Sequence, residues 1–215
     1  MIETVENAAQ FVVVTVCCGI SVFRSMRRRS RLWVLMSLFY GTFLLGLLYW
    51  LLYLLFYGMT PQFRYISELS WYTAYLFLFM ILQFTASPDE RQLNSKLPLL
   101  MPVFATGMCI LYAQFSPWLS NIMSAFVMSL LLYHAFRGML YYRKKKLSCT
   151  RRTLCRLTML FCTSEYCMWT FTCFYWSDRL SNPYFWFDIL QTVCFPLFIP
   201  VVARLEADRK AVDAA

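Results

Sequence analysis

One glutamate lies in the middle of a long apolar stretch, and its neighbours at helical spacing are polar or aromatic. Glu165 comes twelve residues after Thr153, where that stretch begins. Because a helix rises about 1.5 Å per residue, Glu165 would lie about 18 Å into a layer about 30 Å thick if the stretch crossed a membrane. Six residues of the stretch follow one another at intervals of four or three positions: Thr158, Cys162, Glu165, Trp169, Thr172 and Trp176. This spacing predicts one continuous stripe along one helix face.

A second polar group lies in the next apolar stretch. Counted from the start of that stretch, Gln191 and Thr192 reach the depth of Glu165, and Asp188 lies about one turn above them. The connection over residues 177–183 is short, so we expect the two helices to be neighbours with their polar faces toward the bundle interior. The sequence therefore predicts a ligand-binding or ion-coupling site composed of Glu165, Trp169, Asp188, Gln191 and Thr192.

The chemistry of this site depends on what accompanies the Glu165 carboxyl group. A charged side chain in the hydrocarbon costs at least about 2.5 kcal/mol on insertion scales, and the nearest cation along the same helix, Arg156, is nine residues away. Three interpretations stay open. Glu165 is a neutral strut hydrogen-bonded to Gln191 or Thr192, a counter-charge for a cationic ligand caged by Trp169 and other aromatic rings, or a proton or sodium coupling site.

Residue types also exclude several chemistries. His134 is the only histidine, which argues against paired haem ligands and against an H-E-x-x-H zinc protease. All five lysines lie at the ends of apolar stretches or between them, so no retinal Schiff base is expected. We predict no catalytic residue, no metal site and no cofactor. A lipid-modifying enzyme with Glu165 and Asp188 as acid and base remains a third functional class.

The amino-acid composition indicates the kind of fold that positions these side chains. The 215 residues are 60% hydrophobic and only 14% charged, whereas soluble domains carry about 25% charged residues. We predict an all-α, polytopic membrane protein with one seven-helix bundle over residues 1–204 and a cytosolic helical tail over 205–215. The predicted spans are residues 8–23, 32–57, 66–86, 97–115, 118–142, 153–176 and 184–203.

Prolines and tryptophans refine this picture. Pro196 and Pro200 fall inside the last predicted span, and we expect them to kink it and to free backbone carbonyl groups that need new donors. Tryptophans near the outer ends of spans are interpreted as anchors at the membrane surface, a group that includes Trp50, Trp71, Trp118, Trp176 and Trp186.

The distribution of charge predicts the orientation. Of the 20 basic residues, 18 lie on one side, in the first, third and fifth connections, in the span ends that border the fifth connection (Arg137 and Arg156) and after the last span, and only Arg64 and Arg179 lie on the other side. Basic connections stay in the cytoplasm, so the N-terminus is predicted outside and the C-terminus inside. These charges are explained by topology, and we expect no nucleic-acid partner. The lack of an N-x-S/T sequon and of a cleavable signal suits a bacterial cytoplasmic membrane.

Two functional classes fit this architecture better than an enzyme. The first is a sensory module that binds a small cationic or lipophilic ligand within the bundle and signals to a cytosolic protein through the C-terminal tail. Its architecture is similar to that of the seven-helix input regions of bacterial sensor proteins, although no motif supports membership of a family. The second is a small-molecule or ion-coupled transporter, for which the internal sequence repeat typical of such proteins is missing.

Overall fold

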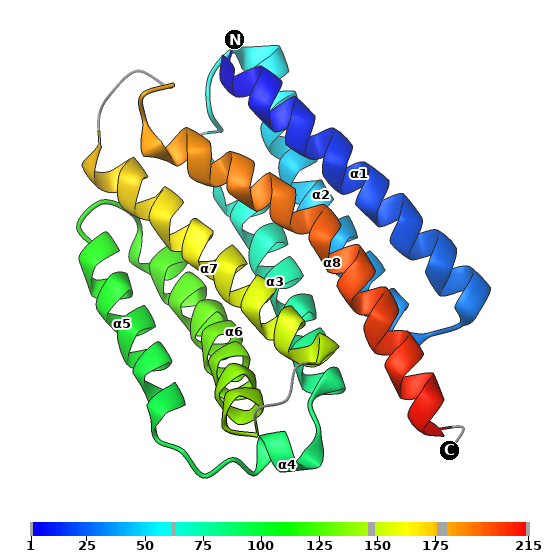
Figure 1. Cartoon of the computed structure of the whole chain (residues 1–215). Coiled ribbons are helices and arrows are strands. Elements are labelled where there is room, and N and C mark those ends of the chain that lie inside the picture. Colours follow the sequence, from blue (N-terminus) through cyan, green and yellow to red (C-terminus); the bar gives the residue numbers. More distant parts are fainter. Residues whose placement is uncertain (1, 62, 146–148, 176–179, 214–215) are drawn as a thin grey trace.

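The computed structural model describes residues 2–61, 63–145, 149–175 and 180–213, which are helical with short connections and contain no strand. Figure 1 shows the helices packed side by side in one bundle. The elements are α1 (Ile2–Arg28), α2 (Arg31–Tyr57), α3 (Tyr65–Thr85), α4 (Pro88–Arg91), a 3-10 turn η1 (Leu97–Leu99), α5 (Leu100–Tyr112), α6 (Trp118–Lys144), α7 (Thr150–Phe174) and α8 (Pro183–Asp213).

Six of the long helices form a closed ring. Going round it, α1 contacts α2, α2 contacts α3, α3 contacts α6, α6 contacts α7, α7 contacts α8, and α8 returns to α1. Helix α5 lies outside this ring against α6, as Figure 1 shows. It also reaches α7, because the Tyr112 hydroxyl donates a hydrogen bond to the Tyr166 carbonyl at 3.1 Å. The neighbouring positions of α7 and α8 agree with the prediction that the two polar stripes share an interface.

Five of these helices are long and apolar enough to cross a membrane: α1, α2, α3, α6 and α8. This confirms a helical protein suited to a bilayer. The count of seven spans and their orientation stay predictions. Helix α5 has only 13 residues, and α7 has 25 but is less apolar because three arginines, Glu165 and several threonines interrupt it.

The outer surface of the ring is apolar, as a lipid-facing surface should be. Large side chains of α2 are exposed along its length, among them Leu45, Leu52 and Leu55. In contrast, the polar side chains Glu165, Asp188 and Gln191 are buried. An exposed apolar surface of this extent would be a liability in water but is stable against acyl chains.

The middle of the bundle is filled by aromatic rings. Phe39, Phe161, Phe195 and Phe198 are all fully buried. The Phe161 and Phe195 centroids are 5.6 Å apart and nearly perpendicular, and those of Phe39 and Phe198 are 5.9 Å apart. Such edge-to-face packing of large rings closes the bundle over its central section.

Helix α8 contains both prolines and changes direction along its length (Figure 1). The Tyr40 hydroxyl of α2 donates a hydrogen bond to the Phe195 carbonyl at 2.7 Å, next to Pro196. The carbonyl groups that lose their helical donor to these prolines lie four residues earlier, at Thr192 and Pro196, so the Tyr40 hydrogen bond joins α2 to α8 without replacing a lost bond. Both prolines are themselves exposed, so their rings lie on the lipid side of α8.

The C-terminal part of α8 packs on the bundle and does not extend from it as a free stalk. Val202 and Leu205 are buried, the Thr150 hydroxyl donates to the Asp208 carboxylate at 2.8 Å, and the Arg209 guanidinium lies 4.3 Å from the centre of the Phe84 ring. The predicted tail over 205–215 is thus described as helix as far as Asp213, and its last two residues lie outside the described ranges.

A buried carboxylate fixes the same end of α8 to the corner between α1 and α2. Glu206 is 4% exposed and accepts hydrogen bonds from Arg28 at 2.9 Å and from the Trp33 indole at 2.8 Å. Lys210, one turn further on, forms an ion pair with it at 3.3 Å. Two hydrogen bonds and a second ion pair around one carboxylate offset the cost of burying it.

The short helix α4 brings a second buried ion pair to this end of the bundle. Ser87 accepts a hydrogen bond from the Glu90 backbone at 3.2 Å and so caps α4. Glu90, which is fully buried, then receives two hydrogen bonds from Arg151 of α7, at 2.8 and 3.2 Å. Gly138 of α6 makes room for this pair, because a Cβ atom there would lie 2.9 Å from the Glu90 carboxylate.

Candidate functional site

A pocket of about 480 Å³ lies at the end of the bundle where the N-terminus and the connections α2–α3 and α7–α8 lie. Its walls come from α1, α2, α3, α6, α7 and α8, and none of the described lining residues belongs to α5. This volume is within the range of pockets that hold small molecules. The pocket is therefore the candidate functional site.

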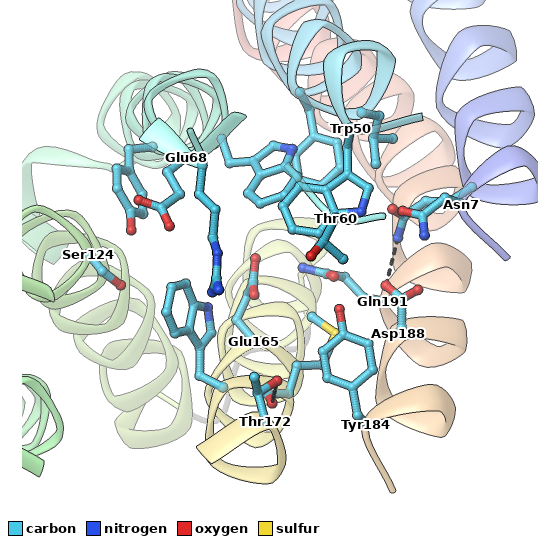
Figure 2. Close-up of a pocket in the computed structure, with 18 of the residues that line it drawn as sticks. Asn7, Trp50, Thr60, Glu68, Ser124, Glu165, Thr172, Tyr184, Asp188 and Gln191 are labelled. Carbon is cyan, nitrogen blue, oxygen red and sulfur yellow. Dashed lines mark hydrogen bonds between the residues drawn. The ribbon is translucent and has the colours of Figure 1, made fainter. Parts of the chain in front are cut away.

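Acidic side chains dominate the charge of this pocket. Four carboxylates line it, namely Glu3, Glu68, Glu165 and Asp188, and Arg64 is the one cationic side chain among the described lining residues. Figure 2 shows Glu165 in the centre of the view, with Glu68 and Ser124 on one side and Gln191 and Asp188 on the other. Charge of one sign inside low-dielectric walls attracts ligands of the opposite sign.

Glu165 lies at the deep end of the site and is 7% exposed. Its side chain is beside those of Trp169, from the next turn of α7, and Gln191, from α8. Among the described residues, no ion pair joins Glu165 to a lysine or arginine. The structure thus places three of the residues predicted from the sequence around one cavity.

The Gln191 side chain has an unused donor. It is 2% exposed and lines the pocket, and its amide nitrogen makes no hydrogen bond to any described residue although Glu165 is close by. Burial of a donor without a partner costs about 1 to 3 kcal/mol. A polar group of a ligand in the pocket would remove that cost.

Asp188 connects α8 to α1. It accepts a hydrogen bond from the Gln10 amide at 3.0 Å, and the same amide donates to Thr192 at 3.0 Å. The Glu6 side chain of α1 also lies close to Asp188. Thr192 contacts this network but does not line the pocket, unlike the other four predicted residues.

Reasoning from the sequence missed the contribution of α3. Glu68 is 8% exposed and accepts a hydrogen bond from the Ser120 hydroxyl of α6 at 2.7 Å, and the Tyr72 and Ser120 hydroxyls are 2.9 Å apart. Glu68 lies near the end of its span, so it was not counted among the carboxylates at mid-membrane depth. A stripe with intervals of four, four and three could have found it: Arg64, Glu68, Tyr72 and Tyr75.

Polar residues at helical spacing also occur near the N-terminus. Glu3, Asn7 and Gln10 follow at intervals of four and three residues, and all three line the pocket. Their spacing places them on one face of α1, toward α8. This stripe was overlooked because the first span was considered for its apolar length and flanking charges, and not for the helical spacing of its polar residues.

Two tryptophans interpreted as membrane anchors also line the pocket. The Trp50 and Trp71 ring centroids are 5.8 Å apart, and the Phe43 ring lies 6.1 Å from Trp71. In contrast, Trp118 and Trp186 are each 60% exposed and fit the anchoring role. Trp176 lies outside the described residues. Trp50, Trp71 and Trp169 together give the pocket aromatic walls, which favour organic cations.

No group of three or more His, Cys, Asp or Glu side chains is placed to hold a metal ion in the described part of the chain. The only histidine, His134, is within hydrogen-bonding distance of the Gln83 amide. The pocket is thus defined by carboxylates, amides and aromatic rings.

Comparison of the chain with protein families, with curated proteins and with solved structures finds no match. Function therefore has to be inferred from the chemistry of the pocket and from its place in the bundle.

Proposed function

We propose that this protein is a membrane receptor that binds a small organic cation in the pocket between α1, α2, α3, α6, α7 and α8. The proposal includes seven membrane spans, an N-terminus outside the cell and a C-terminus in the cytoplasm. With that orientation, the pocket opens toward the outside, where a ligand would arrive from water. The location that fits best is a bacterial cytoplasmic membrane.

The observation that carries this proposal is the buried carboxylate at the base of an aromatic pocket. Glu165 has no cationic partner among the described residues, and Trp169 lies beside it. An ammonium group held between a carboxylate and an indole ring gains both charge pairing and a cation–π interaction, worth about 0.5 to 2 kcal/mol for the latter. A neutral strut would need no cavity in front of the carboxyl group.

The aromatic rings packed beneath the pocket favour a receptor over a transporter. Phe43 lines the pocket and packs 4.6 Å from Phe195, centroid to centroid. Phe195 belongs to the fully buried aromatic cluster that fills the middle of the bundle. A transported ligand would have to displace these rings, whereas a sensed ligand only needs to bind above them.

Helix α8 provides a direct connection from the pocket to the opposite end. It carries Asp188 and Gln191 at the pocket, the two prolines at its centre and Glu206 at the other end. Ligand contacts at Gln191 would change the position of the outer half of α8 relative to the anchored inner half. The exposed side chains of its last turns, Ala207, Lys210 and Ala211, are available to a cytosolic partner.

The test is cation binding by the protein in lipid nanodiscs. We expect pentylamine and choline at millimolar concentration to quench tryptophan fluorescence and to raise the melting temperature of the wild-type protein. Glu165→Gln should abolish both effects and leave the melting temperature of the free protein unchanged. The control is Asp89→Asn, which removes an exposed carboxylate far from the pocket and should behave as wild type.

Two results would refute the proposal. One is that neither cation affects the wild-type protein. The other is that Glu165→Gln binds them as well as wild type does, which would leave Glu165 with the structural role alone.

A further inference from the structure

We propose that the ligand is a zwitterion, with its cationic group at Glu165 and its anionic group at Arg64. This inference rests on the proposed function and names the class of molecule that the same pocket would select. It applies to a small, water-soluble molecule whose two charged groups are separated by several bonds.

Arg64 is a cation whose charge is not used within the described protein. It lines the pocket directly before α3 begins at Tyr65, its side chain is exposed, and no ion pair is formed by it among the described residues. Guanidinium groups bind carboxylates through two parallel hydrogen bonds. The first turn of α3 adds backbone N–H groups whose dipole also favours an anion.

Three of the four pocket carboxylates do not neutralise Arg64, because they have other partners or lie too deep. Glu68 accepts the Ser120 hydroxyl at 2.7 Å, and Asp188 accepts the Gln10 amide at 3.0 Å. Glu165 lies nine residues before the end of α7 at Phe174, which is about 13 Å below the pocket mouth. The proposed anion site lies at the mouth of the pocket, and the proposed cation site lies at its base.

The separation of these two sites sets the length of the ligand. In the proposed arrangement Arg64 lies at the level of the pocket mouth and its side chain reaches about 6 Å inward, which leaves about 7 Å to the depth of Glu165. An ω-amino acid with four methylene groups between its charged ends spans that distance. The unpartnered amide of Gln191, buried beside Glu165 and facing the cavity (Figure 2), gives the chain one more polar contact.

The experiment compares three molecules that differ only in their charged ends. These are δ-aminovalerate, pentylamine and valerate, each titrated into the full-length protein in nanodiscs of phosphatidylglycerol, which has no cationic headgroup. We expect δ-aminovalerate to bind about tenfold tighter than pentylamine, the gain of a charged hydrogen-bonded pair, and valerate to bind weakest.

Two arginine variants identify the group that recognises the anion. Arg64→Gln should bind δ-aminovalerate and pentylamine equally. Arg31→Gln, which removes an exposed arginine at the opposite end of the bundle, should keep the tenfold preference. Melting temperatures of both variants check that they are folded, and Arg64→Lys, which keeps the charge, should restore part of the preference.

A further arm distinguishes a free zwitterion from a lipid headgroup. Phosphatidylethanolamine presents an ammonium group and a phosphate, so we repeat the titration in nanodiscs that contain it. If the affinity for δ-aminovalerate is the same in these nanodiscs, the ligand is a free molecule. If δ-aminovalerate no longer binds in the presence of phosphatidylethanolamine, the lipid headgroup occupies the site and the proposal of a free zwitterion is overturned.

The inference fails on its own if pentylamine and δ-aminovalerate bind the wild-type protein equally, because the cation site then stands without an anion site. The inference also fails if the Arg64→Gln variant still binds δ-aminovalerate more tightly than pentylamine. If none of the three molecules binds, the proposed function fails together with it.

Discussion

At the scale of single residues, Gly46 allows an aromatic ring to form one wall of the pocket. A Cβ atom on Gly46 would lie 2.5 Å from the indole nitrogen of Trp71 and 3.0 Å from the Ser67 carbonyl oxygen. We expect Gly46→Ala to push the Trp71 ring away from α2, to change tryptophan fluorescence and to destabilise the protein by about 1 to 3 kcal/mol.

The matched control is another glycine of the same helix. A Cβ atom on Gly41 would meet only the Cys18 sulfur, at 3.9 Å, which is an ordinary contact. Gly41→Ala should therefore be neutral, or stabilising by up to about 1 kcal/mol because alanine favours helix. Equal melting temperatures for the two variants would contradict the steric role given to Gly46.

The individual residues of the site were partly predictable. Glu165, Trp169, Asp188 and Gln191 were selected from depth and helical spacing, and all four line one pocket. Arg64 was assigned to the outer connection by its position in the sequence alone. Its proposed role depends on how α3 is placed across the pocket from α7, and no local sequence pattern contains that information.

At the scale of elements, α4 is held by a buried ion pair that links it to α7. The side chains of Glu90 and Arg151 are 0% and 5% exposed and lie 2.8 Å apart. Removing one partner leaves a buried charge uncompensated, so Glu90→Gln should cost about 3 to 5 kcal/mol. The measurement is the melting temperature or denaturant midpoint in detergent.

The neighbouring residue supplies the comparison. Asp89 pairs with Lys145 at 3.2 Å, but both side chains are about half exposed or more, at 69% and 47%. Asp89→Asn should therefore cost about 1 kcal/mol or less. The double variant Glu90→Leu with Arg151→Met should recover most of the loss, and failure to recover it would show that packing of α4, not its charge, is what matters.

Elements were more predictable than their contacts. The apolar stretches predicted the long helices, because sustained apolar length is a strong signal. Helix α4 was missed, since its Ser87-Pro88-Asp89-Glu90 start reads equally well as a polar turn. The extension of α8 past residue 203 was interpreted as a tail, and its packing through Arg209 and Glu206 depends on partners from α1, α2 and α3.

At the scale of the whole molecule, the open question is whether α5 and α7 cross the membrane. If only the five most apolar helices crossed, the chain would still begin and end on opposite sides, so a C-terminal reporter cannot distinguish five spans from seven. The connection between α6 and α7 does distinguish them. With seven spans, its cluster of basic residues, which includes Arg143, Lys144 and Lys145, lies in the cytoplasm, whereas with five spans it would lie outside, against the charge rule.

Reporter fusions at two connections test this directly. We expect alkaline phosphatase fused after Ser116, between α5 and α6, to be active, and the same enzyme fused after Ser95, between α4 and α5, to be inactive. A fluorescent protein at these positions should give the opposite pattern. If both alkaline phosphatase fusions are inactive, α5 does not cross, because only a crossing helix can move the reporter from one side to the other between these two residues. In that case the short α5 lies against α6 without spanning, and the basic connection after α6 would have to be explained by a partner on the outer surface.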